Sequence, residues 1–79
     1  MSVFLNLSPD FSVKTDEVIG IFDIESASLS PATRDFLRRK EREGGLISLS
    51  YDLPSSIVVT ADKTYLSKYS ASYLRARIS

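Results

Sequence analysis

Residues 57–60 constrain the fold most, because four residues with high β-propensity (Ile-Val-Val-Thr) follow one another there. A run of this kind predicts a short strand that is buried on both faces. Asp62 and Lys63 predict a tight reversal, and residues 64–66 predict a second strand that pairs with the first as a hairpin. A strand without polar alternation needs cover above and below. In so short a chain, that cover must come from other strands, one long helix or a neighbouring subunit.

The length and the missing residue types exclude several classes of protein. The chain has 79 residues, with no cysteine and no histidine, so we expect one domain over residues 1–79 that buries about 60% of its unfolded surface. Disulfides, thiolate metal sites, the commonest metal ligand and the usual general base are therefore absent. These absences argue against a zinc module, a histidine triad or a thiol enzyme, and we expect no cofactor. Association of several copies is the remaining way for so small a domain to gain buried area.

The first residues predict a strand and no targeting segment. Residues 1–7 contain no basic leader and no long apolar run, which predicts neither a signal peptide nor a membrane span. Val3, Leu5 and Leu7 alternate with Ser2 and Asn6, although Phe4 interrupts the polar side, and indicate a strand with one buried face. The lack of cysteine fits a reducing compartment. We therefore expect a cytoplasmic protein that has no membrane contact.

Charge is distributed unevenly although the ten basic and ten acidic residues cancel. Residues 1–29 hold one base against five acids, a net charge of −4, and residues 63–79 hold four bases and no acid, a net charge of +4. An acidic beginning and a basic end are typical of complementary surfaces in a head-to-tail assembly, or of a basic face for an anionic partner. They are equally compatible with two solvated faces that bind nothing.

Three further segments have the composition of strands. Residues 11–13, 18–24 and 46–51 are rich in β-branched and aromatic side chains. Gly20, inside the second of these, indicates a bulge or a close backbone approach. Asp23 and Glu25 are expected on one face of this strand. Two carboxylates there can serve as an acid–base pair or hold a cation, or they form a solvated strand end.

The long helix is predicted from its end signals. Ser30 is the expected N-cap and Pro31 the first helical residue, and the helix runs to about Glu43, where two glycines can end it. Its apolar stripe is narrow, and its opposite side is rich in arginine: Arg34, Arg38, Arg39 and Arg42. Such a row suits phosphate contacts. Alternatively, these arginines pair with Asp35, Glu41 and Glu43 at helical spacing, as an exposed helix does.

A second basic group lies at the end of the chain. Ser70, or Ser67 before it, is expected to cap a short helix over residues 71–77, with Tyr73, Leu74 and Ile78 on its inner side. The basic residues of this region are Lys68, Arg75 and Arg77. Together, these patterns predict an α+β fold. It has one small, mostly antiparallel sheet of five to six short strands, one long helix and one short C-terminal helix.

Four segments resemble a known family. Residues 18–25, 36–37, 53–60 and 65–67 are similar, in order and spacing, to the RemA/RemB family of small bacterial regulators of extracellular-matrix (biofilm) genes, and most similar to its RemB (YaaB-like) branch. The resemblance covers nearly the whole chain. It implies a cytoplasmic, non-enzymatic, DNA-binding transcriptional regulator without a small-molecule substrate. It also implies a ring-shaped homo-oligomer whose subunit is similar to LytTR-type DNA-binding domains.

The chain departs from this family at its DNA-contacting positions. The RemA branch has arginines at three positions that correspond here to Glu17, Leu53 and Pro54, none of them basic. The candidate DNA-binding residues of this chain are therefore its other basic residues: Arg34, Arg38, Arg39, Arg42, Lys68, Arg75 and Arg77. The rival hypothesis is an oligomeric protein-interaction module that regulates without contacting double-stranded DNA.

Overall fold

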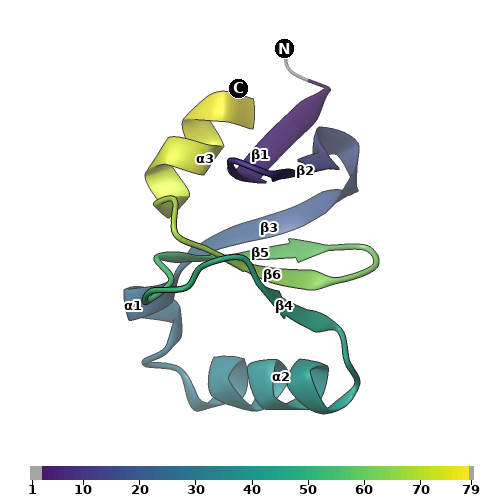
Figure 1. Cartoon of the computed structure of the whole chain (residues 1–79). Coiled ribbons are helices and arrows are strands. Elements are labelled where there is room, and N and C mark those ends of the chain that lie inside the picture. The colour runs from purple at the N-terminus through teal and green to yellow at the C-terminus, as the bar shows by residue number, and fades with distance from the viewer. Residues whose placement is uncertain (1–2, 79) are drawn as a thin grey trace.

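The chain folds into three layers, with a sheet between a hairpin and helix on one side and a long helix on the other (Figure 1). The computed structural model describes residues 3–78. In chain order, the elements are β1 (Phe4–Ser8), β2 (Phe11–Lys14), the 3-10 turn η1 (Thr15–Glu17), β3 (Val18–Asp23), α1 (Ile24–Ala27), α2 (Pro31–Arg42), β4 (Leu46–Ser48), β5 (Ser56–Thr60), β6 (Thr64–Ser67) and α3 (Ala71–Ile78). The predicted small α+β class is confirmed.

The strands form two sheets, so the prediction of one sheet of five to six strands is wrong. β1 and β2 pair with each other as an antiparallel hairpin, and the second sheet has the order β3-β5-β6-β4. The turn η1 redirects the chain after β2, which separates the hairpin from β3. β5 and β6 pair antiparallel at the centre of the second sheet, as expected. β4 pairs with β6 in parallel, unlike the other strand pairs of the described chain.

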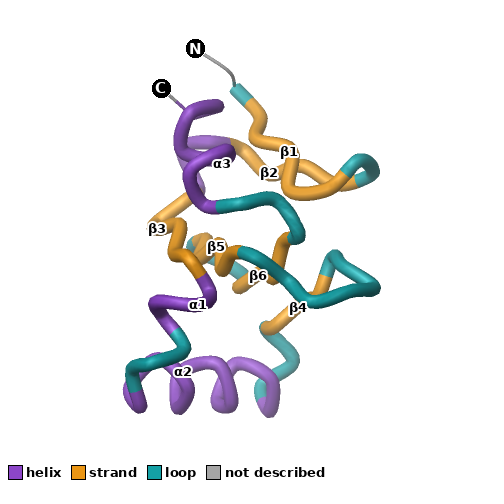
Figure 2. The backbone as a smooth tube through the Cα atoms, turned by 90° about the vertical axis from the view of Figure 1, so that its left-hand side faces the viewer, coloured by secondary structure: helices purple, strands orange, loops and turns teal. Residues whose placement is uncertain are grey.

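The core lies on the sheet face that carries the β1–β2 hairpin and α3 (Figure 2). Ile21, Val58 and Tyr65 stand side by side across β3, β5 and β6. The hairpin and α3 supply the rest of this buried cluster: Leu5, Leu7, Val13, Ala71 and Leu74. The predicted alternation of the first strand is confirmed for Leu5 and Leu7. It fails at Val3, which precedes β1 and is 68% exposed; Met1 and Ser2 lie outside the described residues.

The opposite face of the sheet is covered only in part, by α2. This helix buries none of its residues. It contacts β4 at one edge of the sheet, whereas β3 forms the other edge. On the side of the sheet that faces α2, Ile57 of β5 is therefore buried, but Ile19 and Phe22 of the edge strand β3 stay 71% and 48% exposed.

β3 is shorter than predicted, and its end explains the two neighbouring acids. The register shifts between Val18 and Gly20, which confirms the predicted bulge. A Cβ atom at Gly20 would lie 2.8 Å from the outer end of the Phe22 ring, so a larger residue there would push this exposed ring aside. Asp23 then accepts a hydrogen bond from the backbone N–H of Glu25 at 3.0 Å and caps α1. Asp23 and Glu25 thus flank the start of a helix at Ile24, where the strand was predicted to end, and do not share a strand face.

The strand predicted over residues 46–51 stops at Ser48, because side chains bond to the backbone after it. The Ser48 hydroxyl donates to the carbonyl of Ser50 at 3.2 Å, and the Ser50 hydroxyl accepts from the N–H of Asp52 at 3.2 Å. Local bonds of this kind compete with strand pairing. The segment therefore continues as an irregular loop to β5.

The ends of α2 match their sequence signals. The Ser30 hydroxyl accepts from the N–H of Thr33 at 3.4 Å, and Pro31 is the first helical residue. The helix ends at Arg42 with Glu43 as its C-cap, and Gly44 follows with a φ angle of +77°. This left-handed conformation favours glycine. Glycine is therefore favoured at position 44 because of the backbone conformation that ends the helix.

Replacing Gly44 by alanine should lower the free energy of unfolding by about 1–2 kcal/mol, because a Cβ disfavours the left-handed conformation. A Gly45→Ala variant is the matched control. Its Cβ would meet Lys40 at ordinary contact distances of 3.7 and 3.8 Å, and its φ is not left-handed. Urea unfolding of both variants measures the difference. Equal losses at the two positions would contradict this account of the cap.

Candidate functional site

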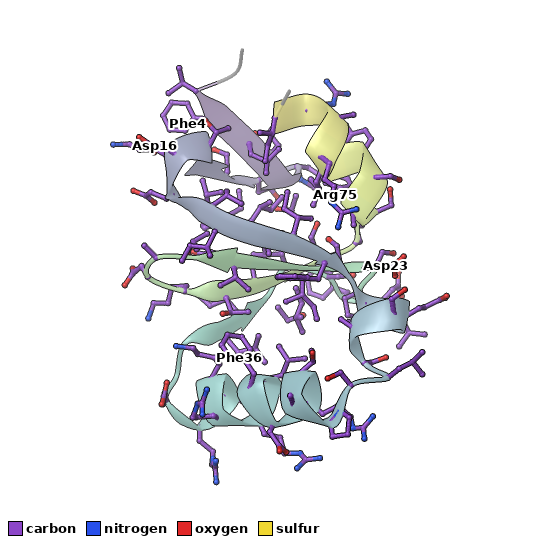
Figure 3. All side chains as sticks on the ribbon, turned by 180° about the vertical axis from the view of Figure 1, so that it is seen from behind. Phe4, Asp16, Asp23, Phe36 and Arg75 are labelled. Atoms are coloured by element: carbon purple, nitrogen blue, oxygen red, sulfur yellow. The ribbon has the colours of Figure 1, made fainter. Side chains whose placement is uncertain are left out.

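The seven candidate DNA-binding residues fall into two groups at opposite ends of the molecule. The α2 group comprises Arg34, Arg38, Arg39 and Arg42, and the α3 group comprises Lys68, Arg75 and Arg77. The sheet and the core separate α2 from α3 (Figure 1). Figure 3 shows the same separation between Phe36 of α2 and Arg75 of α3. One subunit therefore does not present all seven residues as one surface.

Two arginines of the α2 group have partners within the chain. Arg38 pairs with Asp35 at 3.3 Å, with 69% and 73% of the two side chains exposed. Arg34 donates to the carbonyl of Ser28 at 2.6 Å. An exposed ion pair is weak, on the order of 0–1 kcal/mol, so Asp35 holds Arg38 only loosely.

The side chains of the other two arginines make no hydrogen bond or ion pair with another residue of the described range. Arg39 lies over the ring of Phe36, 5.9 Å from its centre, and Arg42 is exposed on the last turn. The predicted ion pair between Glu43 and an arginine of α2 is wrong, since Glu43 pairs with Lys40 at 3.7 Å. Along the outer side of α2 these side chains line a hollow of about 420 Å³: Asp35, Arg38, Arg39, Glu41 and Arg42. It is a polar surface of mixed sign with an excess of positive charge.

In the α3 group, both arginines bond to the chain itself. Arg75 donates to the carbonyl of Ile21 on the edge strand β3 at 2.7 Å. Arg77 donates to the hydroxyl of Tyr73 at 2.9 Å and lies 4.8 Å from the centre of its ring. Tyr73 was expected on the inner side of α3, but it is 44% exposed beside Arg77. Leu74 is buried, and Ile78 packs against the core, as predicted. Lys68 is exposed between β6 and α3.

Glu17, Leu53 and Pro54, the three positions that the resemblance to the RemA branch singled out, present no positive charge. Glu17 is exposed in η1, and Leu53 is 90% exposed. Leu53 and Pro54 line a hollow of about 630 Å³ together with Asp23 and Glu25. An acidic and apolar surface repels phosphate groups.

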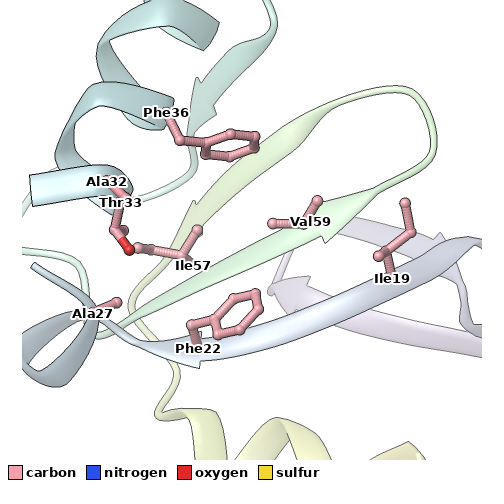
Figure 4. A pocket seen from close by; sticks show the side chains of 8 residues that line it. All are labelled: Ile19, Phe22, Ala27, Ala32, Thr33, Phe36, Ile57 and Val59. Carbon is pink, nitrogen blue, oxygen red and sulfur yellow. The ribbon is translucent and has the colours of Figure 1, made fainter. Parts of the chain in front are cut away.

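A groove that the sequence did not reveal runs between α2 and the sheet. It has a volume of about 360 Å³, and its lining is apolar except for one hydroxyl: Ile19, Phe22, Ala27, Ala32, Thr33, Phe36, Ile57 and Val59 (Figure 4). Ile19 remains 71% exposed and Phe22 48% exposed. One signal in the sequence could have indicated this groove. The strand β3 has more apolar residues than the narrow apolar stripe of α2 can cover.

An acidic patch, formed by Asp16, Glu17 and Asp62, lies where η1 meets the β5–β6 turn. The N–H of Ala61 donates to the carbonyl of Glu17 at 3.1 Å and brings the two segments together. Burial, followed by the charges of Asp62 and Glu17, raises the pKa of Tyr65. The field of these two acids therefore reaches a core tyrosine.

Residues 3–78 contain neither a cluster of metal ligands nor a membrane-spanning helix. No group of three acidic side chains within residues 3–78 is placed to hold a metal ion. None of the helices in this range is long and apolar enough to cross a membrane.

Comparison with known proteins assigns the chain to a family. No protein-family model matches the chain. It is 35% identical over 75 residues to a protein of Bacillus subtilis (strain 168) named extracellular matrix regulatory protein B. The match covers 95% of this chain and 89% of that relative. With this identity over nearly the full length of both proteins, the chain belongs to the RemA/RemB family of extracellular matrix regulatory proteins.

Proposed function

We propose that this protein is an oligomeric, cytoplasmic, non-enzymatic regulator of the transcription of extracellular-matrix (biofilm) genes. In this proposal it binds double-stranded DNA through the α2 group, on a subunit similar to LytTR-type domains. The name of the Bacillus subtilis relative, which describes a matrix regulator, supports the theme of the proposal. The α2 group supports its mechanism.

The observation that carries the proposal is the exposure of α2. This helix buries no residue, and its last turn contains Arg39, Lys40 and Arg42. Arg39 and Arg42 make no ion pair within residues 3–78, and the Arg38–Asp35 pair is exposed. A phosphate can therefore reach these guanidinium groups without displacing a buried partner. One helix binds weakly, but several copies in one assembly can engage one duplex together.

The α3 group has a smaller role in this proposal. Arg75 and Arg77 are engaged with Ile21 and Tyr73, so phosphate binding would compete with bonds inside the subunit. Lys68 is exposed and could add to a DNA contact only if copies bring it near the α2 group of a neighbour.

A second candidate function is an oligomeric protein-interaction module that does not touch DNA. The hollow beside Leu53 and Pro54 favours it, because Asp23 and Glu25 line that hollow. A surface of this kind suits a partner with basic and apolar side chains. In this case the fold would serve assembly and partner binding.

Reversing Arg38 and Arg42 to glutamate should weaken binding to duplex DNA at least about tenfold, since each reversal removes a phosphate contact and adds repulsion. Fluorescence anisotropy between about 50 and 200 mM salt should also show a flatter salt dependence. The matched control is Arg38→Lys with Arg42→Lys, which keeps both charges and should retain most of the affinity.

The mass of the assembly is measured in the same buffers. A wild-type assembly that stays intact but ignores DNA at low salt would contradict the DNA proposal and favour the interaction module. Equal binding by the glutamate and lysine variants would place the DNA contact outside α2. Reversing Lys68 and Arg77 would then test the α3 group.

A further inference from the structure

We propose that the apolar groove beside α2 receives Val3 and Phe4 of a second copy of this chain, so that copies join head to tail. The inference rests on the oligomer in the proposed function and identifies its interface. It does not depend on DNA binding.

The groove lacks the cover that a sheet face normally receives. Ile57 is 2% exposed, but its neighbours Ile19 and Phe22 stay largely open, because α2 contacts the other edge of the sheet. A volume of about 360 Å³ equals the share of about twelve water molecules in the liquid. That space is ample for an aromatic side chain. Water against such apolar walls is unfavourable, so burial by an apolar partner would stabilise an assembly.

The chain offers an apolar projection at its other end. Val3 is 68% exposed and Phe4 56% exposed. This projection is held in place, because Thr15 donates to the carbonyl of Val3 through its N–H at 2.9 Å and its hydroxyl at 3.2 Å. Phe4 also stands opposite Lys14 in the β1–β2 pair. Little conformational entropy would therefore be lost when Phe4 enters a groove.

The charges around the two surfaces are mixed but differ in their balance. Beside Phe36, Glu43 pairs with Lys40, which leaves Arg39 as the excess cation. Beside Phe4, Lys14 stands opposite in the hairpin and Arg77 lines the same hollow, against the three carboxylates of the acidic patch. Arg39 and Lys40 lie 5.9 and 5.6 Å from the centre of the Phe36 ring, which forms one wall of the groove. Asp16 follows Thr15, the residue that holds Val3, and Figure 3 shows Asp16 and Phe4 at the same end of the subunit. Insertion of Phe4 would bring the acidic patch of one copy towards the cations of the next. Opposite charges of this kind would fix the orientation of the contact.

The two surfaces lie at opposite ends of the subunit, so the contact is heterologous. In Figure 3, Phe4 lies at the end that carries β1 and Phe36 at the end that carries α2. A subunit cannot fill its own groove, and each copy offers one projection and one groove. Repetition of the contact closes a ring or extends a filament, according to the rotation between copies.

Two single substitutions at exposed positions test the contact. Phe4→Ser removes the projection, and Ile19→Lys places a charge in the groove. Each variant alone should be monomeric at concentrations where the wild type assembles, with association weakened at least about tenfold. When the two are mixed, the intact Phe4 of one variant should enter the intact groove of the other. Native mass spectrometry should then show a pair with one copy of each.

The double variant carrying both substitutions should stay monomeric alone and join neither partner. Tyr51→Ser, which removes a fully exposed aromatic side chain elsewhere, should assemble like the wild type, and circular dichroism checks that every variant is folded. A monomeric wild type, unchanged assembly of Phe4→Ser or Ile19→Lys, or no heterodimer in the mixture would each overturn the proposal. These masses are measured without DNA. A failure of this contact is therefore distinct from loss of DNA binding by an intact assembly.

Discussion

Replacing Leu74 by alanine is expected to lower the free energy of unfolding by about 2–5 kcal/mol. Leu74 is 0% exposed in the core, and α3 contacts β1 and β3. The only other buried residue of the described part of α3 is the small Ala71. Leu74 is therefore the main apolar anchor of this helix. A domain of this length has a stability of roughly 4–12 kcal/mol, so the loss would be a large share of the total.

The matched control is Leu53→Ala, at a leucine that is 90% exposed. Its effect should stay within about 0.5 kcal/mol. Urea unfolding followed by circular dichroism measures both variants, at one protein concentration because assembly adds to apparent stability. Similar losses for Leu74→Ala and Leu53→Ala would contradict the position of the core.

Two buried serines face each other across β5 and β6. Replacing each by alanine should affect the free energy of unfolding differently, with a loss at only one of the two positions. Ser56 and Ser67 are partners in the strand register, and both are 0% exposed. The Ser67 hydroxyl donates to the carbonyl of Leu7 at 2.6 Å and accepts from the N–H of Tyr69 at 3.1 Å. The Ser56 hydroxyl has no hydrogen-bond partner within the described chain. The two positions thus differ mainly in hydrogen bonding.

Ser67→Ala should lower the free energy of unfolding by about 1–3 kcal/mol, because it leaves the buried groups of Leu7 and Tyr69 unpaired. Ser56→Ala should leave stability unchanged or raise it by about 1 kcal/mol, since it removes a buried hydroxyl without a partner. Both free energies come from the same denaturation experiment. A destabilisation of equal size at Ser56 would show that its hydroxyl has a partner in solution.

The elements with strong local signals could be predicted from the sequence. The helix α2 was predicted because Ser30, Pro31 and Gly44 act on the backbone within a few residues of themselves. The β5–β6 hairpin was predicted for the same reason, since its apolar runs and its turn are contiguous. The bulge at Gly20 also follows from one residue type.

The division into two sheets and the parallel pairing of β4 were not predictable from those signals. Both depend on contacts between distant segments, such as the pairing of β4 with β6 after an irregular loop. The early end of β4 depends on side-chain bonds at Ser48 and Ser50 that compete with strand pairing. A prediction from strand propensity does not account for side-chain hydrogen bonds that compete with strand pairing.

For the candidate site, the charged residues and the contiguous segments that form the long helix and the central hairpin could be read from the chain's order of residues. The positions of those charges in space depend on tertiary packing. The bond from Arg75 to Ile21 joins residues 54 positions apart, and that from Ser67 to Leu7 joins residues 60 apart. The structure also separates the α2 group from the α3 group and opens the groove beside Phe22. Helix caps and turns are set by interactions within a few residues along the chain. Burial and the contacts between surfaces depend instead on how the whole chain packs.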